Sequence, residues 1–205
     1  MERKEPGVRI AVIGTGNIGS TLGAAFARAG HQVRFGSRHP QPSADDPQVS
    51  DLATALADAE VVLLAVPAAA LDGFLAEHAG ALAGRLVIDA TNRIGAPVAN
   101  AAARLSQAAP TARYVRAFNT LGWENFAQPV FDGVPADLFF SCPADDRAAV
   151  EELITAVGLR PAYLGEGKQD VVDGVLPLWF ALVQANGGNR RVALRVLQKE
   201  PDAQV

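Results

Sequence analysis

The chain has 205 residues, of which 49% are hydrophobic and 20% are charged, and its formal net charge is −4. This composition is typical of a globular protein of one domain. The acidic balance gives no electrostatic support for a nucleic-acid partner, and we expect none. A single cysteine, Cys142, excludes an internal disulfide framework and indicates a reducing compartment. Because it falls inside a predicted strand, core packing is its expected role.

No stretch of the sequence has the features of a membrane span or a secretion signal. The apolar runs are much shorter than the roughly 20 residues that cross a bilayer, and no signal-type apolar core follows the charged start MERKEPG. We therefore expect a soluble, cytoplasmic protein with no membrane partner. The sequence also has no HExxH, CxxC, EF-hand or Walker pattern, so we expect no metal site.

Predicted strands and helices alternate along most of the chain. In order, the sequence predicts strand 9–14, helix 17–29 ended by Gly30, strand 31–35, loop 39–50, helix 51–58 with Asp51 as N-cap, strand 60–66, helix 68–79, strand 84–89, helix 97–107 with a proline in its first turn, strands 112–118 and 136–142, helix 145–157, strand 160–164 and a largely helical segment 170–197. This alternation predicts an α/β fold of the Rossmann type, with a doubly wound, mostly parallel sheet. We expect residues 1–205 to form a single domain with a C-terminal helical segment over about 170–198.

The first predicted strand runs directly into the pattern Gly14-x-Gly16-x-x-Gly19, which opens the first helix. In a dinucleotide-binding turn the first glycine allows the tight turn, the second lets the backbone approach the pyrophosphate, and the third allows close helix–strand contact. Three further residues would offer backbone N–H groups at the helix N-terminus: Thr15, Asn17 and Ile18. The alternative interpretation is a glycine-rich turn without a ligand, but the strand–turn–helix context favours a dinucleotide.

The second predicted strand ends in FGSR, at the position where such folds read the 2′ position of the adenosine ribose. Folds that bind NAD place a carboxylate there, which would repel a 2′-phosphate. Here Ser37 offers a hydroxyl, and Arg38 can bind a phosphate through two parallel hydrogen bonds. The pair therefore predicts NADP(H) as the cofactor, with a solvated turn as the alternative.

Three further segments follow apolar runs and should open toward the nicotinamide half of the cofactor. The residues that we predict to bind there are Val66, Pro67, Thr91, Asn119 and Leu121. Their backbone and side-chain polar groups would hold the carboxamide, although each segment could be an ordinary turn after a strand. The sequence shows no general acid or base for alcohol chemistry: none of the three histidines ends a strand, and Asp89 has no basic partner nearby in sequence. We therefore expect no catalytic side chain and an acceptor that takes a hydride directly, a flavin or a deazaflavin.

These motifs together resemble the family of coenzyme F420-dependent NADP oxidoreductases. The likeness extends over nearly the whole chain, through GTGNIG at 14–19, GSR at 36–38, VP at 66–67, AFNT at 117–120 and PLWFALVQAN at 177–186. The resemblance implies that the glycine loop binds pyrophosphate and that Ser37 and Arg38 bind the 2′-phosphate. It also implies direct hydride transfer between nicotinamide C4 and deazaflavin C5. The AFNT segment is similar, too, to the reductase domain of membrane ferric reductases, which pass NADPH electrons to a flavin.

The sequence thus predicts an NADPH-dependent oxidoreductase whose small-molecule acceptor is F420 or, as the runner-up, FMN or FAD. A redox sensor that binds NADP(H) without turnover is the alternative. Because only one helical stretch follows the last predicted strand, we expect a shallow acceptor cleft on the nucleotide domain. Its candidate apolar walls are Trp123, Phe126 and Trp179, although core or interface packing is the more common role of such residues. The nearly all-apolar segment 177–183 indicates a surface that packs against a second copy, and hence a homodimer.

Overall fold

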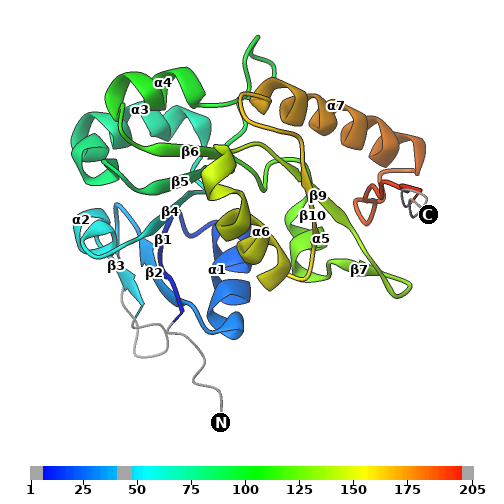
Figure 1. The fold of residues 1–205 in the computed structure, drawn as a ribbon, viewed down its shortest axis with the longest axis horizontal. Helices are drawn as coiled ribbons and strands as arrows, with labels where there is room; N and C mark the ends of the chain where they lie inside the picture. Colours follow the sequence, from blue (N-terminus) through cyan, green and yellow to red (C-terminus); the bar gives the residue numbers. More distant parts are fainter. Residues whose placement is uncertain (1–6, 41–47, 200–205) are drawn as a thin grey trace, which may run out of the picture.

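The computed structural model describes residues 7–40 and 48–199, and at its centre lies a six-stranded sheet (Figure 1). The strands are β1 (Arg9–Ile13), β2 (Gln32–Gly36), β3 (Val49–Ser50), β4 (Val61–Leu64), β5 (Leu86–Asp89) and β6 (Arg113–Arg116). They lie in the order β3-β2-β1-β4-β5-β6, and every neighbouring pair is parallel. The strand order reverses between β1 and β4, so the predicted doubly wound sheet of the Rossmann type is confirmed.

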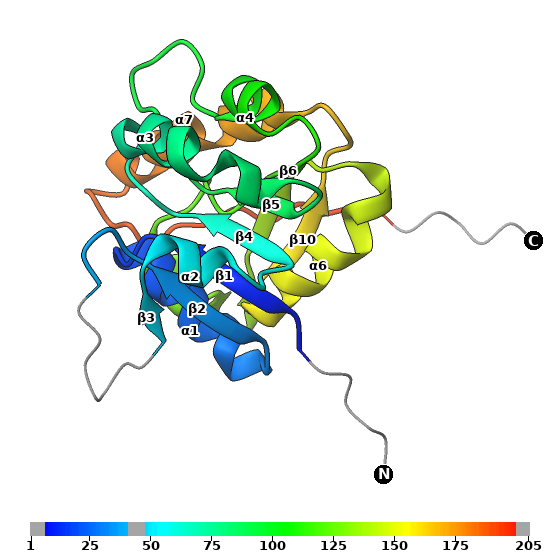
Figure 2. The same ribbon diagram turned by 90° about the vertical axis from the view of Figure 1, so that its left-hand side faces the viewer.

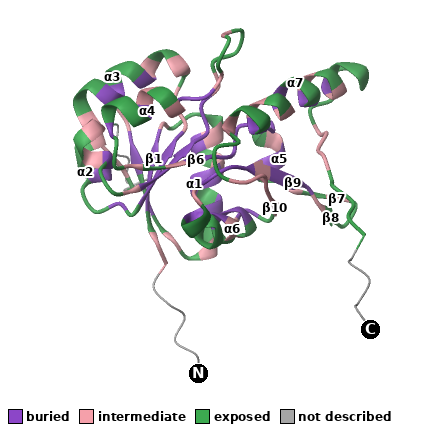
Figure 3. Ribbon diagram, turned by 45° about the horizontal axis from the view of Figure 1, so that its top comes forward, coloured by how far each residue is buried: buried purple, intermediate pink, exposed green. Residues whose placement is uncertain are grey.

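Helices cover both faces of this sheet (Figures 1 and 2). The α-helices are α1 (Asn17–Ala29), α2 (Leu52–Leu56), α3 (Ala68–His78), α4 (Ala102–Ala108), α5 (Trp123–Ala127), α6 (Arg147–Ala156) and α7 (Gln169–Ala185), with short 3-10 turns η1 (Ala79–Leu82) and η2 (Ala144–Asp146). Successive residues of a strand point to opposite faces. Ile10 and Val12 accordingly join one core cluster with α1 and α6, whereas Ala11 and Ile13 join the other with α2, α3 and α4. Figure 3 shows the buried strands between exposed helix surfaces.

Two smaller strand pairs lie beside the sheet. Strands β9 (Asp137–Phe140) and β10 (Arg160–Tyr163) are parallel to each other, and the hairpin of β7 (Val130–Phe131) and β8 (Val134–Pro135) projects at the right of Figure 1. We predicted the strands at 136–142 and 160–164. They form their own sheet, which meets β6 through a single antiparallel bridge between Arg116 and Ser141.

Two predicted helices have different limits in the structure. The helix expected over 97–107 begins only at Ala102, because the buried Asp89 carboxylate accepts the N–H of Ala101 at 2.8 Å and the Asn100 side chain accepts that of Ala102 at 3.1 Å. The helix expected over 170–197 ends at Ala185, since two glycines with positive φ follow it. The residues beyond it run without helix, and their backbone is held by side chains of α5 and β9.

The strand expected over 112–118 is also shorter, because Phe118 has a left-handed φ of 59° and cannot continue a strand. Sequence analysis missed β3, α5 and the β7–β8 hairpin. The hairpin has the Asp132-Gly133 pair at its turn, with φ of 48° and 84°, which is a recognised hairpin signal. Most of the loop expected over 39–50 lies outside the described residues, and its last two residues form β3.

Other local predictions are confirmed. Asp51 caps α2 by accepting the N–H of Thr54 at 2.9 Å, and Gly30 ends α1 with a left-handed φ of 100°. Cys142 is buried in the core cluster that also contains α1. Within residues 7–40 and 48–199, no helix is long and apolar enough to cross a membrane.

Candidate functional site

The parallel register brings the carboxyl ends of five strands into one row. Gly36, Ile13, Leu64, Asp89 and Arg116 are successive register partners across β2, β1, β4, β5 and β6. Each predicted binding segment begins within three residues of this row. Ligands of open α/β sheets lie at this edge, beside the point where the strand order reverses, and the predicted residues therefore gather at one edge of the sheet.

The glycine loop has the close contacts that its motif predicts. Gly14 has a φ of 112°, and a Cβ there would lie 2.5 Å from the carbonyl oxygen of Ala65 in the neighbouring segment. A Cβ on Gly19 would overlap the carbonyl oxygen of Gly14, so the helix start packs directly on the turn. A Cβ on Gly16 would meet no atom within 4 Å. Gly16 is thus the glycine whose open side faces space that a ligand can fill.

A first cavity of about 410 Å³ extends from this loop to the end of β2. Among its lining residues are Gly14, Thr15, Gly16, Ser37, Arg38, His39, Val66 and Pro67. Ser37 is fixed by its backbone, which donates to Ser50 at 3.0 Å, and its hydroxyl oxygen accepts the N–H of His39 at 3.2 Å. Arg38 is exposed at the rim.

The far wall of the first cavity comes from α2 and α3, and sequence analysis did not identify it. Leu52, Ala70, Gly73, Phe74 and Glu77 supply this wall. A mainly apolar surface opposite a glycine loop is suited to the flat face of a purine. The apolar residues of a helix that follows a strand could have signalled this wall, but they also read as ordinary core positions.

A second cavity of about 410 Å³ continues on the other side of the loop. It shares Gly16, Ala65, Val66 and Pro67 with the first cavity. Its other lining residues include Asn17, Ile18, Thr91, Asn92, Ile94, Asn119, Leu121, Trp123, Trp179, Phe180 and Arg190. Of the thirteen predicted binding residues, twelve line one or both cavities, and Gly19 lies buried behind them. Trp123 and Trp179 line the second cavity as expected, but Phe126 does not, because it packs in the core against Phe118.

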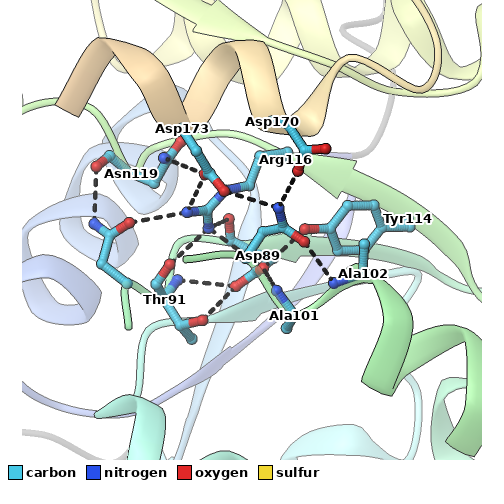
Figure 4. Close-up of polar contacts among 11 residues, drawn as sticks. Asp89, Thr91, Ala101, Ala102, Tyr114, Arg116, Asn119, Asp170 and Asp173 are labelled. Atoms are coloured by element: carbon cyan, nitrogen blue, oxygen red, sulfur yellow. Dashed lines mark hydrogen bonds and ion pairs between the residues drawn. The ribbon is translucent and has the colours of Figure 1, made fainter. Parts of the chain in front are cut away.

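Behind the second cavity lies a buried polar network that the sequence did not reveal (Figure 4). Asp89 accepts hydrogen bonds from the backbone and hydroxyl of Thr91, at 3.0 and 2.6 Å, and from the hydroxyl of Tyr114, at 2.8 Å. Arg116 lies 3.3 Å from the same carboxylate and donates from Nε to Asp173 of α7 at 2.6 Å. The missing basic partner of Asp89 is therefore Arg116, its register neighbour on the next strand.

Burial also determines which groups of this region can exchange protons. It raises the pKa of the Tyr114 hydroxyl far above its ordinary value of 10.0, and the nearby Asp89 carboxylate adds to this effect. Tyr114 is therefore protonated at any physiological pH and serves as a hydrogen-bond donor.

Two buried polar atoms of the segment that follows β6 have no hydrogen-bond partner among the described residues. They are the side-chain oxygens of Asn119 and Thr120. The Asn119 side chain is held by its nitrogen, which donates to Asp173 at 3.3 Å, and its carbonyl oxygen is left as an acceptor. A carboxamide has the N–H donor that such an oxygen needs. The site thus fits a dinucleotide: a phosphate-binding loop in the middle, a cation at one end and amides at the other.

Comparisons with known proteins agree with this fit. The family described as NADP oxidoreductase, coenzyme F420-dependent, matches residues 9–93. A structure described as a proposed F420-dependent NADP reductase from Arthrobacter sp. FB24 superposes with a TM-score of 0.81 and 26% identity, over 94% of this chain and 100% of that chain.

A reductive aminase from Aspergillus terreus, solved with NADPH and ethyl levulinate, has a TM-score of 0.67 and 22% identity, over 89% of this chain and 63% of that one, and shows the fold alone. Among curated relatives, a glycerol-3-phosphate dehydrogenase [NAD(P)+] of Pseudomonas fluorescens is 31% identical over 106 residues, which are 42% of this chain. The chain spans 31% of the length of that relative.

Proposed function

We propose that the chain, whose residues 9–93 match the family of coenzyme F420-dependent NADP oxidoreductases, exchanges a hydride between NADP(H) and a deazaflavin of the F420 type. The observation that carries this proposal is the pair of adjoining cavities, which run from Arg38 past Gly16 to Asn119. A dinucleotide needs this sequence of contacts, and a smaller ligand would not. The family match and the fold of its relatives support the same cofactor class.

At the adenosine end, Arg38 and Ser37 would bind the 2′-phosphate. Arg38 is exposed at the cavity rim and makes no ion pair with another described residue. A guanidinium binds a phosphate through two parallel hydrogen bonds, and residues 37–40, which follow β2, include no carboxylate of the kind with which NAD-binding folds read the ribose hydroxyls. The backbone N–H groups at the start of α1 would bind the pyrophosphate, where the helix dipole favours negative charge.

At the opposite end, Asn119 and Thr91 would orient the nicotinamide ring. Both side chains are buried, and the free acceptor oxygen of Asn119 is suited to a carboxamide N–H. The apolar side chains of Val66 and Leu121 exclude water from the same wall. When bound, the reduced cofactor supplies a hydride. The residues of the site would hold the donor and the acceptor together, and the proton that the reduced acceptor takes up would come from solvent.

The acceptor would occupy the outer part of the second cavity. Ile94 and Trp123 are 75% and 39% exposed at its mouth, so a conjugated ring can pack on apolar surface there. Arg190 lies with its guanidinium 5.0 Å from the ring centre of Trp179, and its charge is paired with Glu124 at 2.6 Å, so it contributes a flat, neutralised edge to the mouth of the cavity. F420, FMN and FAD all combine a flat ring with a phosphate, and we place F420 first on the strength of the family match.

Steady-state oxidation of NADPH with separate acceptors tests this proposal. We expect the absorbance at 340 nm to fall when F420 is added, together with loss of oxidised F420. Turnover with FMN or FAD but not with F420 would show that the acceptor is a flavin and not a deazaflavin. Tight NADPH binding without oxidation by any of the three would contradict the enzyme and favour a redox sensor.

We further propose that α7 pairs with the α7 of a second copy. Its outer side has apolar residues at the spacing of a coiled-coil seam: Val171, Val175, Leu178, Leu182 and Ala185. Val171 and Leu178 are about half exposed, although both are apolar. Because the opposite side of the helix packs on the second cavity through Leu176 and Trp179, pairing would also rigidify the wall of the site.

A further inference from the structure

The wall of the second cavity is held from behind by charged side chains that do not line it. Asn92 and Asn119 line the cavity, whereas Arg116 and Asp173 are not among its lining residues. Arg116 belongs to β6 and Asp173 to α7, so the network joins the sheet to the C-terminal helix (Figure 4). The arrangement separates the residues that would touch a ligand from those that determine their positions.

Each cavity amide has a fixed orientation because of this network. The side-chain oxygen of Asn92 accepts from Nη2 of Arg116 at 2.9 Å, and its nitrogen donates to the backbone oxygen of Asn119 at 2.8 Å. The side-chain nitrogen of Asn119 donates to Oδ1 of Asp173 at 3.3 Å. An amide whose nitrogen is engaged in this way must present its oxygen elsewhere, and this is the oxygen left without a partner.

Asp173 can fill its position only as a carboxylate. Its Oδ1 accepts from Arg116 and Asn119, and its Oδ2 accepts from the side-chain nitrogen of Asn100 at 2.8 Å. An asparagine in its place would put its N–H donor against one of these donors, and that hydrogen bond would be lost. The carboxylate therefore determines both the direction of the Asn119 amide and the docking of α7 on the sheet.

We propose that Asp173 and Arg116 are positioning residues, which act through Asn119 and Asn92 to prepare the cavity for the nicotinamide half of the cofactor. This inference rests on the proposed function. It assigns to α7 a role in the chemistry of the site, because the helix contributes the carboxylate that orients the amide. The 2′-phosphate end of the site has no contact with this network, so the two ends can be tested separately.

The test compares NADPH with 2′,5′-ADP, which has the 2′-phosphate but no nicotinamide. We expect Asp173→Asn to weaken NADPH binding about tenfold and to leave 2′,5′-ADP binding within about twofold of the wild-type value. Titration calorimetry measures both ligands, and the emission of bound NADPH reports the surroundings of its ring. The matched control is Asp137→Asn, which removes another buried carboxylate, bound by Arg160 far from the cavity.

A double-mutant cycle with Asn119→Ala tests whether Asp173 acts through that amide. If it does, the double variant binds NADPH no more weakly than Asn119→Ala alone. Equal losses for both ligands in Asp173→Asn, no loss for either, or additive losses in the cycle would each overturn the inference.

Arg116→Lys provides a second variant in case Asp173→Asn does not fold. The lysine keeps the charge but cannot reach Asn92 and Asp173 together, and we expect the same selective loss of NADPH. Failure of the wild-type protein to bind either ligand would overturn the proposed function, and this inference with it. Binding of both ligands by the wild type, with an unchanged ratio in each folded variant, would overturn the inference alone.

Discussion

The guanidinium of Arg116 lies 3.3 Å from the carboxylate of Asp89, and neither side chain is exposed to solvent. The two residues are register partners on adjacent strands, so the ion pair lies in the sheet itself, at its carboxyl edge. A buried pair of this kind adds little net stability over an apolar pair, but removing one partner leaves an uncompensated charge. Loss of either partner would therefore destabilise the sheet at the edge that forms the site.

We predict that Arg116→Met lowers the free energy of unfolding by about 3–5 kcal/mol, because Asp89 and Asp173 would lose their shared cation. Tyr114→Phe should cost about 1–2 kcal/mol, since Asp89 keeps its other donors when the hydroxyl is lost. Urea unfolding followed by circular dichroism measures both values. A smaller loss of unfolding free energy for Arg116→Met than for Tyr114→Phe would contradict the larger contribution that we assign to the ion pair.

Arg38→Ala should weaken NADPH about ten- to hundred-fold and leave NADH almost unchanged, because only NADPH has the phosphate that the guanidinium would bind. Fluorescence titration with each nucleotide gives the two affinities. Arg34→Ala is the control, since Arg34 lies on β2, four residues before Arg38, donates to the backbone oxygen of Thr54 and does not line the first cavity. Equal effects of Arg38→Ala on both nucleotides would refute the assignment of the 2′ site.

Two glycines of the loop should respond in opposite ways to a larger side chain. Gly16→Val should keep the melting temperature within a few degrees but abolish nucleotide binding, because its side chain would enter free cavity space. Gly19→Val should unfold the protein or lower its melting temperature strongly, because a Cβ there overlaps Gly14. Differential scanning fluorimetry with and without NADPH separates the outcomes. A Gly16→Val protein that still binds NADPH would show that the turn is only structural.

Alkaline pH should destabilise the protein through Cys142. Burial, with a contribution from Asp146, raises the pKa of this thiol from its ordinary value of 9.0 to about 12. The folded state therefore holds the proton more tightly, so the stabilisation is complete below pH 9 and is lost as the pH rises from 9 to about 12. One proton corresponds to about 1.4 kcal/mol per pH unit.

Urea unfolding of the wild type and of Cys142→Ala between pH 9 and 10 measures this slope by difference, since the tyrosines contribute to both proteins alike. The alanine variant lacks the thiol, and its free energy of unfolding should fall by about 1 kcal/mol less over this range, because the unfolded thiol ionises gradually. Identical slopes in the two proteins would show that the thiol is not protected by the fold.

Leu178→Glu should convert a dimer into a monomer, because the charge would fall in the centre of the proposed α7 seam. Sedimentation velocity measures the mass of each species. Gln184→Glu adds the same charge to the same helix outside the seam and should leave the dimer intact. A wild-type protein that sediments as a monomer at all concentrations would contradict the pairing.

Local patterns were enough to predict the sheet and the cofactor loop. The glycine motif directly follows its strand, and Ser37 and Arg38 directly follow the next one, so each signal is local in the sequence. Gly14 also has a φ of 112°, a conformation that favours glycine. Strand alternation then places all the binding segments at one edge, because parallel strands have their carboxyl ends on the same side. Twelve residues predicted in this way line the two cavities.

The errors in the predicted elements have a common cause. The start of α4 depends on a carboxylate twelve residues earlier in the chain, and the end of β6 depends on the packing of Phe118 in the core. The end of α7 had a local signal in Gly187 and Gly188, which the apolar pattern around it outweighed.

The sequence by itself determined the fold class, and it is the basis on which we predict the phosphate-binding turn and the preference for a 2′-phosphate, because these depend on neighbouring residues and on backbone conformation. Only the tertiary structure decided that Asp89, Arg116 and Asp173 form one buried network, since they come from three elements separated by 27 and 57 positions along the chain. The physical reason is the cost of burying charge. Three ionised side chains can be desolvated only where the fold brings them within hydrogen-bond distance of one another.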